Sequence, residues 1–349
     1  MATAWFAILA VMLTVYVVLD GFDLGAGVVH FFVAKNDDER RAVLAAIGPV
    51  WDGNEVWLIA SAGILVFAFP RAYAAAFSGF YLPLMMALWL LVLRGVSIEF
   101  RSHHENPLWR SFWDSVFAAA SVVLTIVLGV ALGNVVRGVP LTREGYFSAP
   151  LFTSLHAGGA ELGAIDGYTA LVGLFALFAL GAHGALYLQC KTAGAVQARS
   201  AVLARRLWIV VAILGAATTL ATWAMQPRLF AALATRPWAW PLVVAAPAAL
   251  VTTAIALRRR RDGIAFAGSA ALLAAMLGAT AAGLFPVLLR STIDPGLSLD
   301  VHNAAAGGRG LLLGLAWWIP ATALAAGYFV YVYRSFRGKV TPGGDSHHG

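Results

Sequence analysis

Long apolar stretches separated by short polar segments run along the whole chain. Nine of the apolar stretches reach about 20 residues, the length that a helix needs to cross the hydrocarbon core of a bilayer. They lie near residues 3–34, 54–70, 72–94, 113–136, 166–190, 207–225, 240–257, 264–289 and 310–333. Each is expected to be helical, because every backbone donor and acceptor must be satisfied inside lipid. The pattern predicts an all-α integral membrane protein with nine transmembrane helices.

The composition supports the same interpretation. Of the 349 residues, 60% are hydrophobic and 12% are charged, and the mean hydropathy is +0.79. These values exclude an ordinary soluble globular protein. The first apolar stretch has no basic segment before it and no small-residue cleavage site, so we interpret it as a retained span. The single cysteine, Cys190, excludes an internal disulfide and a cysteine-based metal cluster.

The basic residues predict the orientation of the chain in the membrane. The segments after the first, third, fifth and seventh stretches, together with the C-terminal tail, hold 17 of the 24 Lys and Arg residues, and the alternate segments hold 7. By the positive-inside rule, the N-terminus is expected outside and the C-terminus in the cytoplasm. This distribution accounts for the net charge of +7 without a nucleic-acid partner.

A polar stripe runs along the first predicted helix. At 100° per residue, five side-chain positions fall within an arc of about 80°. They are Tyr16, Asp20, Asp23, Gly27 and His30. Lipid cannot solvate such a stripe, so it must face a helix bundle, another subunit or a hydrated path. No helix cap explains the two aspartates, which favours a functional role for them.

Gly21 and Gly25 form a GxxxG pattern on a different face of the same helix. Small residues at this spacing let a second helix approach closely. The pattern predicts a structural role, although glycine is common in membrane helices.

The segment "DGNE" places Asp52, Asn54 and Glu55 at the start of the second apolar stretch. This spacing fits an N-cap aspartate with a glutamate at the third helical position. A functional role for Asp52 is an equally good interpretation, and the two are compatible. Trp57 points roughly away from the face that Asp52 and Glu55 share.

Three further polar residues have simple structural explanations. Glu99 and His103 lie at the cytoplasmic end of the third stretch, where a solvated loop is the simpler interpretation. His183 lies between small residues in the fifth stretch, and a lone histidine there is more often a hydrogen-bonded core residue than a haem ligand. We therefore assign neither a haem ligand nor a metal ligand to this chain.

Several motifs together resemble one membrane protein family. They are "DGFDLGAG", "GPVWDGNEVWLI", "FPRAYAAAFSGFYLPL", "YLQCKTAG" and "STIDPGLSLDVHNA", spread from residue 20 to about residue 303. These segments resemble subunit II of the cytochrome bd quinol oxidases. The length and the short outer loops are similar to the compact, cyanide-insensitive type.

The resemblance implies a fold of two four-helix bundles plus a ninth helix, in a single membrane domain over residues 1–349. On this expectation residues 1–136 form the first bundle, 137–165 an outer loop, 166–289 the second bundle, 310–333 the ninth helix and 334–349 a cytoplasmic tail. It also implies a partner subunit I that carries two haems b and one haem d and oxidises quinol. The complex, set among lipid and quinone in the inner membrane, would reduce O2 to water with cytoplasmic protons, and it could include a small accessory subunit.

The resemblance also implies roles for single residues. Asp52 matches the family's acidic residue on the proton path, Glu99 and His103 match polar positions at its cytoplasmic mouth, and Trp57 matches a residue on the oxygen-access route. Some relatives have lysine in place of His103 and aspartate in place of Glu99, so the mouth of the path would titrate differently here. Buried together with Asp52, the Asp20 and Asp23 carboxyl groups would suit a proton relay.

Two other classes of function are compatible with intramembrane acids. One is an ion-coupled secondary transporter, although the nine stretches show no recognisable pair of inverted halves. The other is a purely structural membrane subunit without chemistry of its own.

Overall fold

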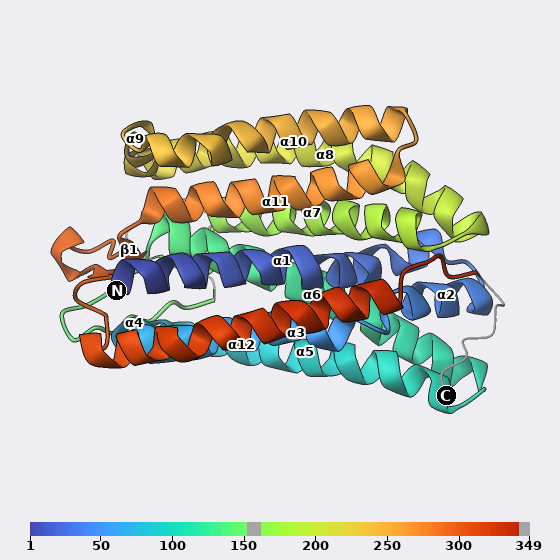
Figure 1. Ribbon diagram of the computed structural model, residues 1–349, viewed down its shortest axis with the longest axis horizontal. Helices are drawn as coiled ribbons and strands as arrows, with labels where there is room; N and C mark the ends of the chain where they lie inside the picture. Colours follow the sequence, from blue (N-terminus) through green and yellow to red (C-terminus); the bar gives the residue numbers. More distant parts are fainter. Residues whose placement is uncertain (152–161, 342–349) are drawn as a thin grey trace.

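The computed structural model describes residues 1–151 and 162–341, and most of them are helical (Figure 1). The long helices, which lie side by side along the long axis, are α1 (Ala2–Val33), α3 (Trp51–Ala68), α5 (Tyr81–Phe100), α6 (Pro107–Arg137), α7 (Gly167–Lys191), α8 (Gly194–Met225), α10 (Trp240–Arg258), α11 (Asp262–Leu284) and α12 (Gly308–Ser335). The expected outer loop and cytoplasmic tail lie partly outside the described residues.

Short elements connect the long helices. They are α2 (Asp37–Ile47), α4 (Pro70–Gly79), α9 (Pro227–Ala234), the 3-10 turns η1 (Arg101–His103), η2 (Pro237–Ala239) and η3 (Pro295–Leu297), and the antiparallel strands β1 (Val287–Leu289) and β2 (Leu299–Asp300). Within the described part of the chain, eight helices are long and apolar enough to cross a membrane, and the bent pair α2–α3 would make nine. The all-α membrane class is thus confirmed. The 47° bend between α2 and α3 lies at Gly48 and Pro49, which interrupt the helix.

Several predicted spans have different boundaries in the structure. Helix α8 begins at Gly194 rather than near residue 207, α6 begins at Pro107 rather than near residue 113, and two other spans are interrupted or shortened. The stretch predicted at 72–94 is divided between the short helix α4 and the span α5, which begins only at Tyr81. Hydropathy does not register the break, because the residues on both sides of it are mainly apolar. At the break Gly79 fits against the ring of Phe147, where a Cβ atom would lie only 2.1 Å away. The stretch predicted at 264–289 ends earlier, since α11 stops at Leu284 and Pro286 follows.

Helix α1 is the centre of the bundle. It contacts α3, α6, α7 and α11, and its C-terminal half is almost completely buried. At Gly25 the backbones of α1 and α7 touch, because a Cβ atom there would lie 2.0 Å from the Leu180 carbonyl oxygen and 2.7 Å from the Gly184 nitrogen. The side chain of Leu180 also covers Gly21. The close packing of α1 against α7 therefore fixes the position of the polar stripe.

Helix α12 lies along the outside of the bundle (Figure 1). Of its residues only Leu311 is buried in the described chain. It packs on α1 through the rings of Trp318 and Trp5 and on α3 through the rings of Phe329 and Trp57. Its large apolar side chains are mostly exposed, with Trp317 79% accessible.

Candidate functional site

A buried arginine joins two acidic side chains in the middle of the bundle. Arg94 of α5 donates from Nη1 to Asp20 Oδ1 of α1 at 2.6 Å and from Nη2 to Glu55 Oε2 of α3 at 2.9 Å. Arg94 and Asp20 are both 0% exposed, and the Glu55 side chain is 18% exposed. Charge-assisted hydrogen bonds of this kind are strong, and removing one partner would leave the others charged and unpaired in the interior.

A second chain of hydrogen bonds runs from Asp23 to α12. Asn54 of α3 donates from Nδ2 to Asp23 Oδ2 at 2.7 Å and more weakly to the Leu19 carbonyl oxygen at 3.4 Å. The Tyr333 hydroxyl of α12 donates to Asn54 Oδ1 at 3.0 Å. Asp23 makes no ion pair within the described residues, although it shares the buried α1 face with Asp20.

Three oxygens in this region are buried without a hydrogen-bond partner in the described structure. They are Tyr16 Oη, Asp20 Oδ2 and Asp23 Oδ1. Buried polar atoms are usually satisfied, so unsatisfied ones mark a place where protons or water can be accommodated. We define Asp20, Asp23, Glu55 and Arg94 as the acid cluster.

Asp52 and its neighbours differ from the predicted cap. Helix α3 begins at Trp51 with Val50 as the N-cap residue, and no side chain caps it. The prediction that Asp52 and Glu55 cap this helix is therefore wrong, because the helix starts two residues earlier than an Asp52 cap requires and Glu55 is held by Arg94. Asp52 is exposed in the first turn, where the helix dipole favours a negative charge. Asn54 has a structural role through its hydrogen bonds with α1 and α12.

The other sequence-predicted residues lie away from the acid cluster. Glu99 and His103 are both exposed at the end of α5, and His103 Nδ1 lies 3.0 Å from the Glu99 carbonyl oxygen. Trp57 is half-buried, with its ring 5.4 Å from that of Phe329. The sequence analysis thus grouped two separate sets of residues into one proton path. One set belongs to the acid cluster, and the other lies on the surface at the end of α5.

A second network of ion pairs, centred on the buried Arg101 and Asp114, lies where α1 ends and α6 begins. Arg101 donates from Nε to Asp114 Oδ1 at 2.6 Å and from Nη2 to Asp37 Oδ1 at 2.7 Å, and His30 Nε2 lies 3.1 Å from Asp114 Oδ1. Partial burial tends to raise the pKa of the Asp37 carboxyl, but Arg101 and neighbouring arginines outweigh this and hold the pKa below its usual value. This network fixes α2 and the end of α5 to the bundle.

His183 occupies a closed environment in α7. Its Nδ1 lies 2.7 Å from Ser269 Oγ and its Nε2 lies 3.0 Å from the Val18 carbonyl oxygen, while Phe266 stacks on the ring. Both ring nitrogens are thus engaged within the chain, which is the geometry of a hydrogen-bonded core histidine. No group of three or more metal-ligating side chains occurs within the described ranges.

Comparison with known proteins identifies the family to which this chain belongs. Residues 1–336 match the sequence model of the family described as cytochrome bd terminal oxidase subunit II. The chain belongs to this family. The resemblance drawn from the five sequence motifs is therefore confirmed.

Individual members of the cytochrome bd subunit II family align over almost the whole chain. The cytochrome bd ubiquinol oxidase subunit 2 of Bacillus subtilis (strain 168) is 31% identical over 341 residues, which cover 97% of this chain and 96% of that protein. The cytochrome bd-I ubiquinol oxidase subunit 2 of Escherichia coli (strain K12) is 30% identical over 365 residues, covering 97% and 94%. A chain of the solved bd oxidase from Geobacillus thermodenitrificans shares the fold, with a TM-score of 0.71 at 19% identity over 96% of this chain and 98% of that chain.

Sequence reasoning missed two residues of this cytochrome bd subunit II. Arg94 is the last residue of the stretch predicted at 72–94, and it was counted there only as a basic residue near a membrane surface. An arginine within an apolar stretch is itself a signal of a buried acidic partner. Tyr333 gave no such signal, because a tyrosine near the end of a span is typical of the membrane interface.

Proposed function

We propose that this cytochrome bd subunit II acts beside a haem-bearing subunit I in a quinol-oxidising complex of the cytoplasmic membrane. Both named relatives are ubiquinol oxidase subunits. The two haems b, the haem d and the site of quinol oxidation are expected in subunit I. Lipid and quinone would surround the pair, and a small accessory subunit could complete it.

The specific task that we assign to the acid cluster is to supply cytoplasmic protons for the reduction of O2. The observation that carries this proposal is the imbalance of charge. Asp20 and Glu55 share the guanidinium of Arg94, and Asp23, buried on the same face of α1, has no cation paired with it among the described residues. A buried site with three carboxyl groups and one cation is electrically neutral only when it holds protons. Such a site can take up and release protons during turnover.

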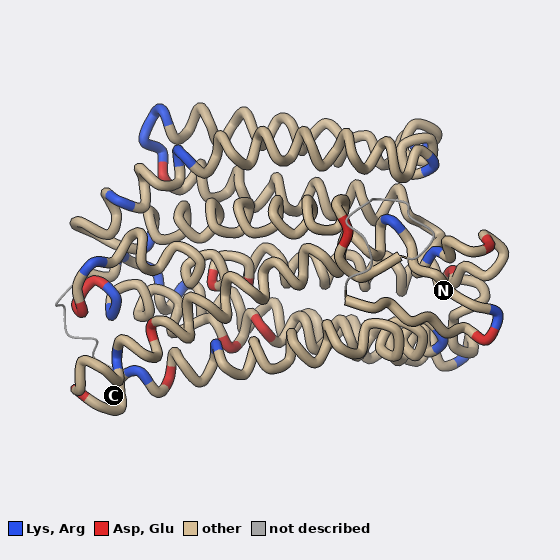
Figure 2. Tube along the Cα trace, turned by 180° about the vertical axis from the view of Figure 1, so that it is seen from behind, with Lys and Arg blue, Asp and Glu red and all other residues tan. Residues whose placement is uncertain are grey.

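The proposed path begins at the surface and ends at the acid cluster. Glu99, His103 and Asp52 are exposed and could collect protons, and Glu55 is three residues along α3 from Asp52. Arg94 bridges Glu55 and Asp20 and holds these two carboxyl groups on one guanidinium, and Asp23 follows on the same face of α1. The protons would pass between carboxyl groups, since the guanidinium itself stays protonated. Apart from the charges at the two ends of the bundle, the charged positions in Figure 2 gather in the half away from the N-terminus. The positive-inside rule makes this the cytoplasmic half.

The same proposal includes the architecture that the resemblance implies. Contacts join α1 to α3 and α6, with α5 on α6, and join α7 to α8 and α11, with α10 on α11. The two groups also pack extensively on each other, through α1 and α6 against α7. These two groups support a division into two four-helix bundles, with α12 as the ninth span. The start of α1 and the end of α12 lie at opposite ends of the long axis, as an odd number of crossings requires (Figure 1).

Trp57 has a separate proposed role on the oxygen-access route. It lies on α3 beside Phe329 of α12, where the bundle surface is apolar and half-exposed. Apolar O2 partitions into such surroundings, so a tryptophan there could shape the route from lipid to the haem in subunit I.

Conservative substitutions in the assembled oxidase test the proton path. We expect Asp23→Asn and Asp52→Asn to slow quinol-driven oxygen uptake per haem d by tenfold or more, because asparagine keeps the shape and loses the titratable group. Asp38→Asn is the matched control, since Asp38 is exposed near the same end of α1. Full turnover in Asp23→Asn at normal haem content would remove the acid cluster from the path, and full turnover in Asp52→Asn would remove that entrance alone.

A further inference from the structure

Asn54 is the junction between the acid cluster and α12. Its side chain is completely buried. The amide nitrogen donates to Asp23 Oδ2 and to the Leu19 carbonyl oxygen, and the amide oxygen accepts from the Tyr333 hydroxyl. All of the amide's polar groups are therefore used, and each neighbour constrains its orientation.

Asp23 and Tyr333, the two side chains on either side of the Asn54 amide, differ in the hydrogen bonds that they can accept or donate. An ionised Asp23 only accepts hydrogen bonds, so it requires the amide nitrogen of Asn54 to face it. A protonated Asp23 can donate, and it then pairs equally well with the amide oxygen. A tyrosine hydroxyl both donates and accepts, so Tyr333 can satisfy Asn54 in either orientation.

We infer that Tyr333 is a positioning residue that lets the Asn54 amide reverse when Asp23 gains or loses its proton. In the ionised state Tyr333 donates to Asn54 and Asn54 donates to Asp23. In the protonated state Asp23 donates to the Asn54 oxygen, and the amide nitrogen donates to the Tyr333 oxygen. The inference rests on the proposed proton path and extends it to α12, because the hydrogen bond that Tyr333 makes changes with the charge of Asp23.

Two features of the structure favour Tyr333 for this role. Helix α12 packs loosely on the bundle, with one buried residue among those described, so the Tyr333 contact is one of few polar links between α12 and the core. A cavity of about 20 Å³, bordered by Gly53, Phe329 and Tyr333, lies beside the hydroxyl-bearing side chain. That volume suffices for one water molecule. It would give the tyrosine ring room to adjust next to the start of α3.

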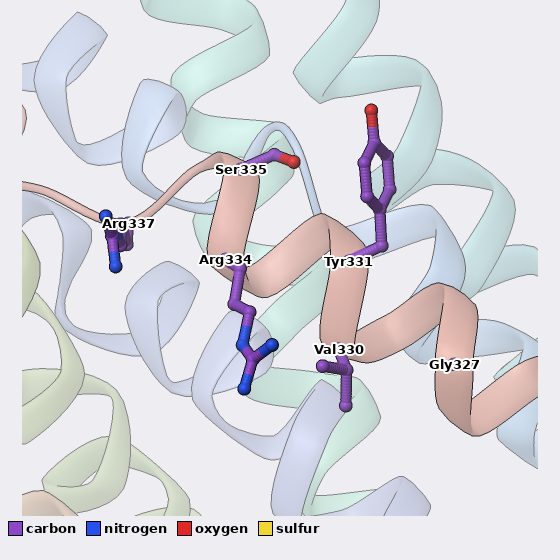
Figure 3. Close-up of a pocket in the computed structure, with 6 residues that line it drawn as sticks. All are labelled: Gly327, Val330, Tyr331, Arg334, Ser335 and Arg337. Atoms are coloured by element: carbon purple, nitrogen blue, oxygen red, sulfur yellow. The ribbon is translucent and has the colours of Figure 1, made fainter.

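The experiment compares Tyr333→Phe with Tyr331→Phe in the assembled oxidase. Tyr331 is a close match, because it lies two residues away on α12 and is 69% exposed on the outer surface of the helix (Figure 3). Without the hydroxyl, the end of the Asn54 amide that faces residue 333 is left unpaired in either orientation, the oxygen in one and the nitrogen in the other. We expect oxygen uptake per haem d to fall about two- to tenfold in Tyr333→Phe, the range for one lost buried hydrogen bond, and to stay unchanged in Tyr331→Phe.

Infrared difference spectra provide a readout that a purely structural role would not move. In the wild-type oxidase we expect a tyrosine band that changes during turnover, because the Tyr333 hydroxyl switches between donor and acceptor. The band should be absent in Tyr333→Phe, absent in Asp23→Asn, where nothing is protonated, and present in Tyr331→Phe. A tyrosine band that persists in Tyr333→Phe would overturn the inference.

The two proposals fail in different ways. If Asp23→Asn turns over normally, the proton path is wrong whatever Tyr333 does. If Asp23→Asn is slow but Tyr333→Phe behaves like Tyr331→Phe in both uptake and spectra, the path stands and the positioning role of Tyr333 is refuted.

Discussion

At the scale of single residues, Arg94 determines whether the acid cluster can exist. Its guanidinium lies within 2.9 Å of two carboxylates from different helices, and it is fully buried. Breaking a buried ion pair by removing one partner typically costs about 3–5 kcal/mol, because the remaining charge stays in the interior. The acid cluster therefore cannot lose its one cation without leaving buried carboxyl groups unpaired.

We predict that Arg94→Met lowers the yield and the thermal stability of the assembled oxidase, by about 3–5 kcal/mol in free energy of unfolding. Adding Glu55→Gln should recover part of the loss, since one unpaired carboxylate disappears. Arg206→Met is the control, because Arg206 is exposed on α8. Melting of the purified complex, followed by its haem absorbance, measures the effect. Equal stability of Arg94→Met and Arg206→Met would contradict the buried pairing.

At the scale of helices, the contact between α1 and α7 fixes where the acid cluster sits. Gly25 and Gly184 bring the two backbones together, and no side chain on either residue could fit between them. Both helices carry buried polar groups on either side of this contact, including Asp23 and His183. A change of helix spacing here would therefore displace the acid cluster as well as the core.

We predict that Gly25→Ala destabilises the subunit by about 1–3 kcal/mol, the usual cost of overpacking, because the added Cβ would meet the Leu180 carbonyl oxygen at 2.0 Å. Gly63→Ala is the matched control, since nothing lies within 4 Å of a Cβ added at Gly63 on α3. The measurement is the melting temperature of the assembled oxidase. Indistinguishable melting of the two variants would mean that the helices separate without cost.

The apolar pattern located the helices, and the stripe on α1 identified Asp20 and Asp23 as buried, because both depend on periods that the sequence carries locally. Which helices meet that stripe is a tertiary property, so the pairing with Arg94 and the link to Tyr333 could not be read from spacing. The predicted cap at Asp52 failed for a similar reason. The local motif fits a cap, but the bend after α2 starts α3 at Trp51 and tertiary pairing takes Glu55.

At the scale of the whole molecule, the two ends of the bundle have different characters. The ion-pair network of Arg101, Asp114 and Asp37 lies at the end where α1 and α5 finish. The opposite end, where α1 begins, carries α4, α9 and the two short strands (Figure 1). Because the acid cluster lies nearer the first of these ends, the orientation of the chain determines the side of the membrane from which the proposed path would draw protons.

Orientation can be tested with reporters that are active only outside the cytoplasm. A reporter fused after Thr341, the last described residue, should be silent, because the positive-inside rule places the end of α12 in the cytoplasm. A reporter fused after Leu289, beyond α11, should be active, since that segment lies at the end where α1 begins. The two fusions differ by one crossing, so opposite signals confirm that α12 spans the membrane. Activity after Thr341 together with silence after Leu289 would mean that the protein has the opposite orientation. The acid cluster would then lie nearer the outer side and could not collect cytoplasmic protons through Glu99 and His103.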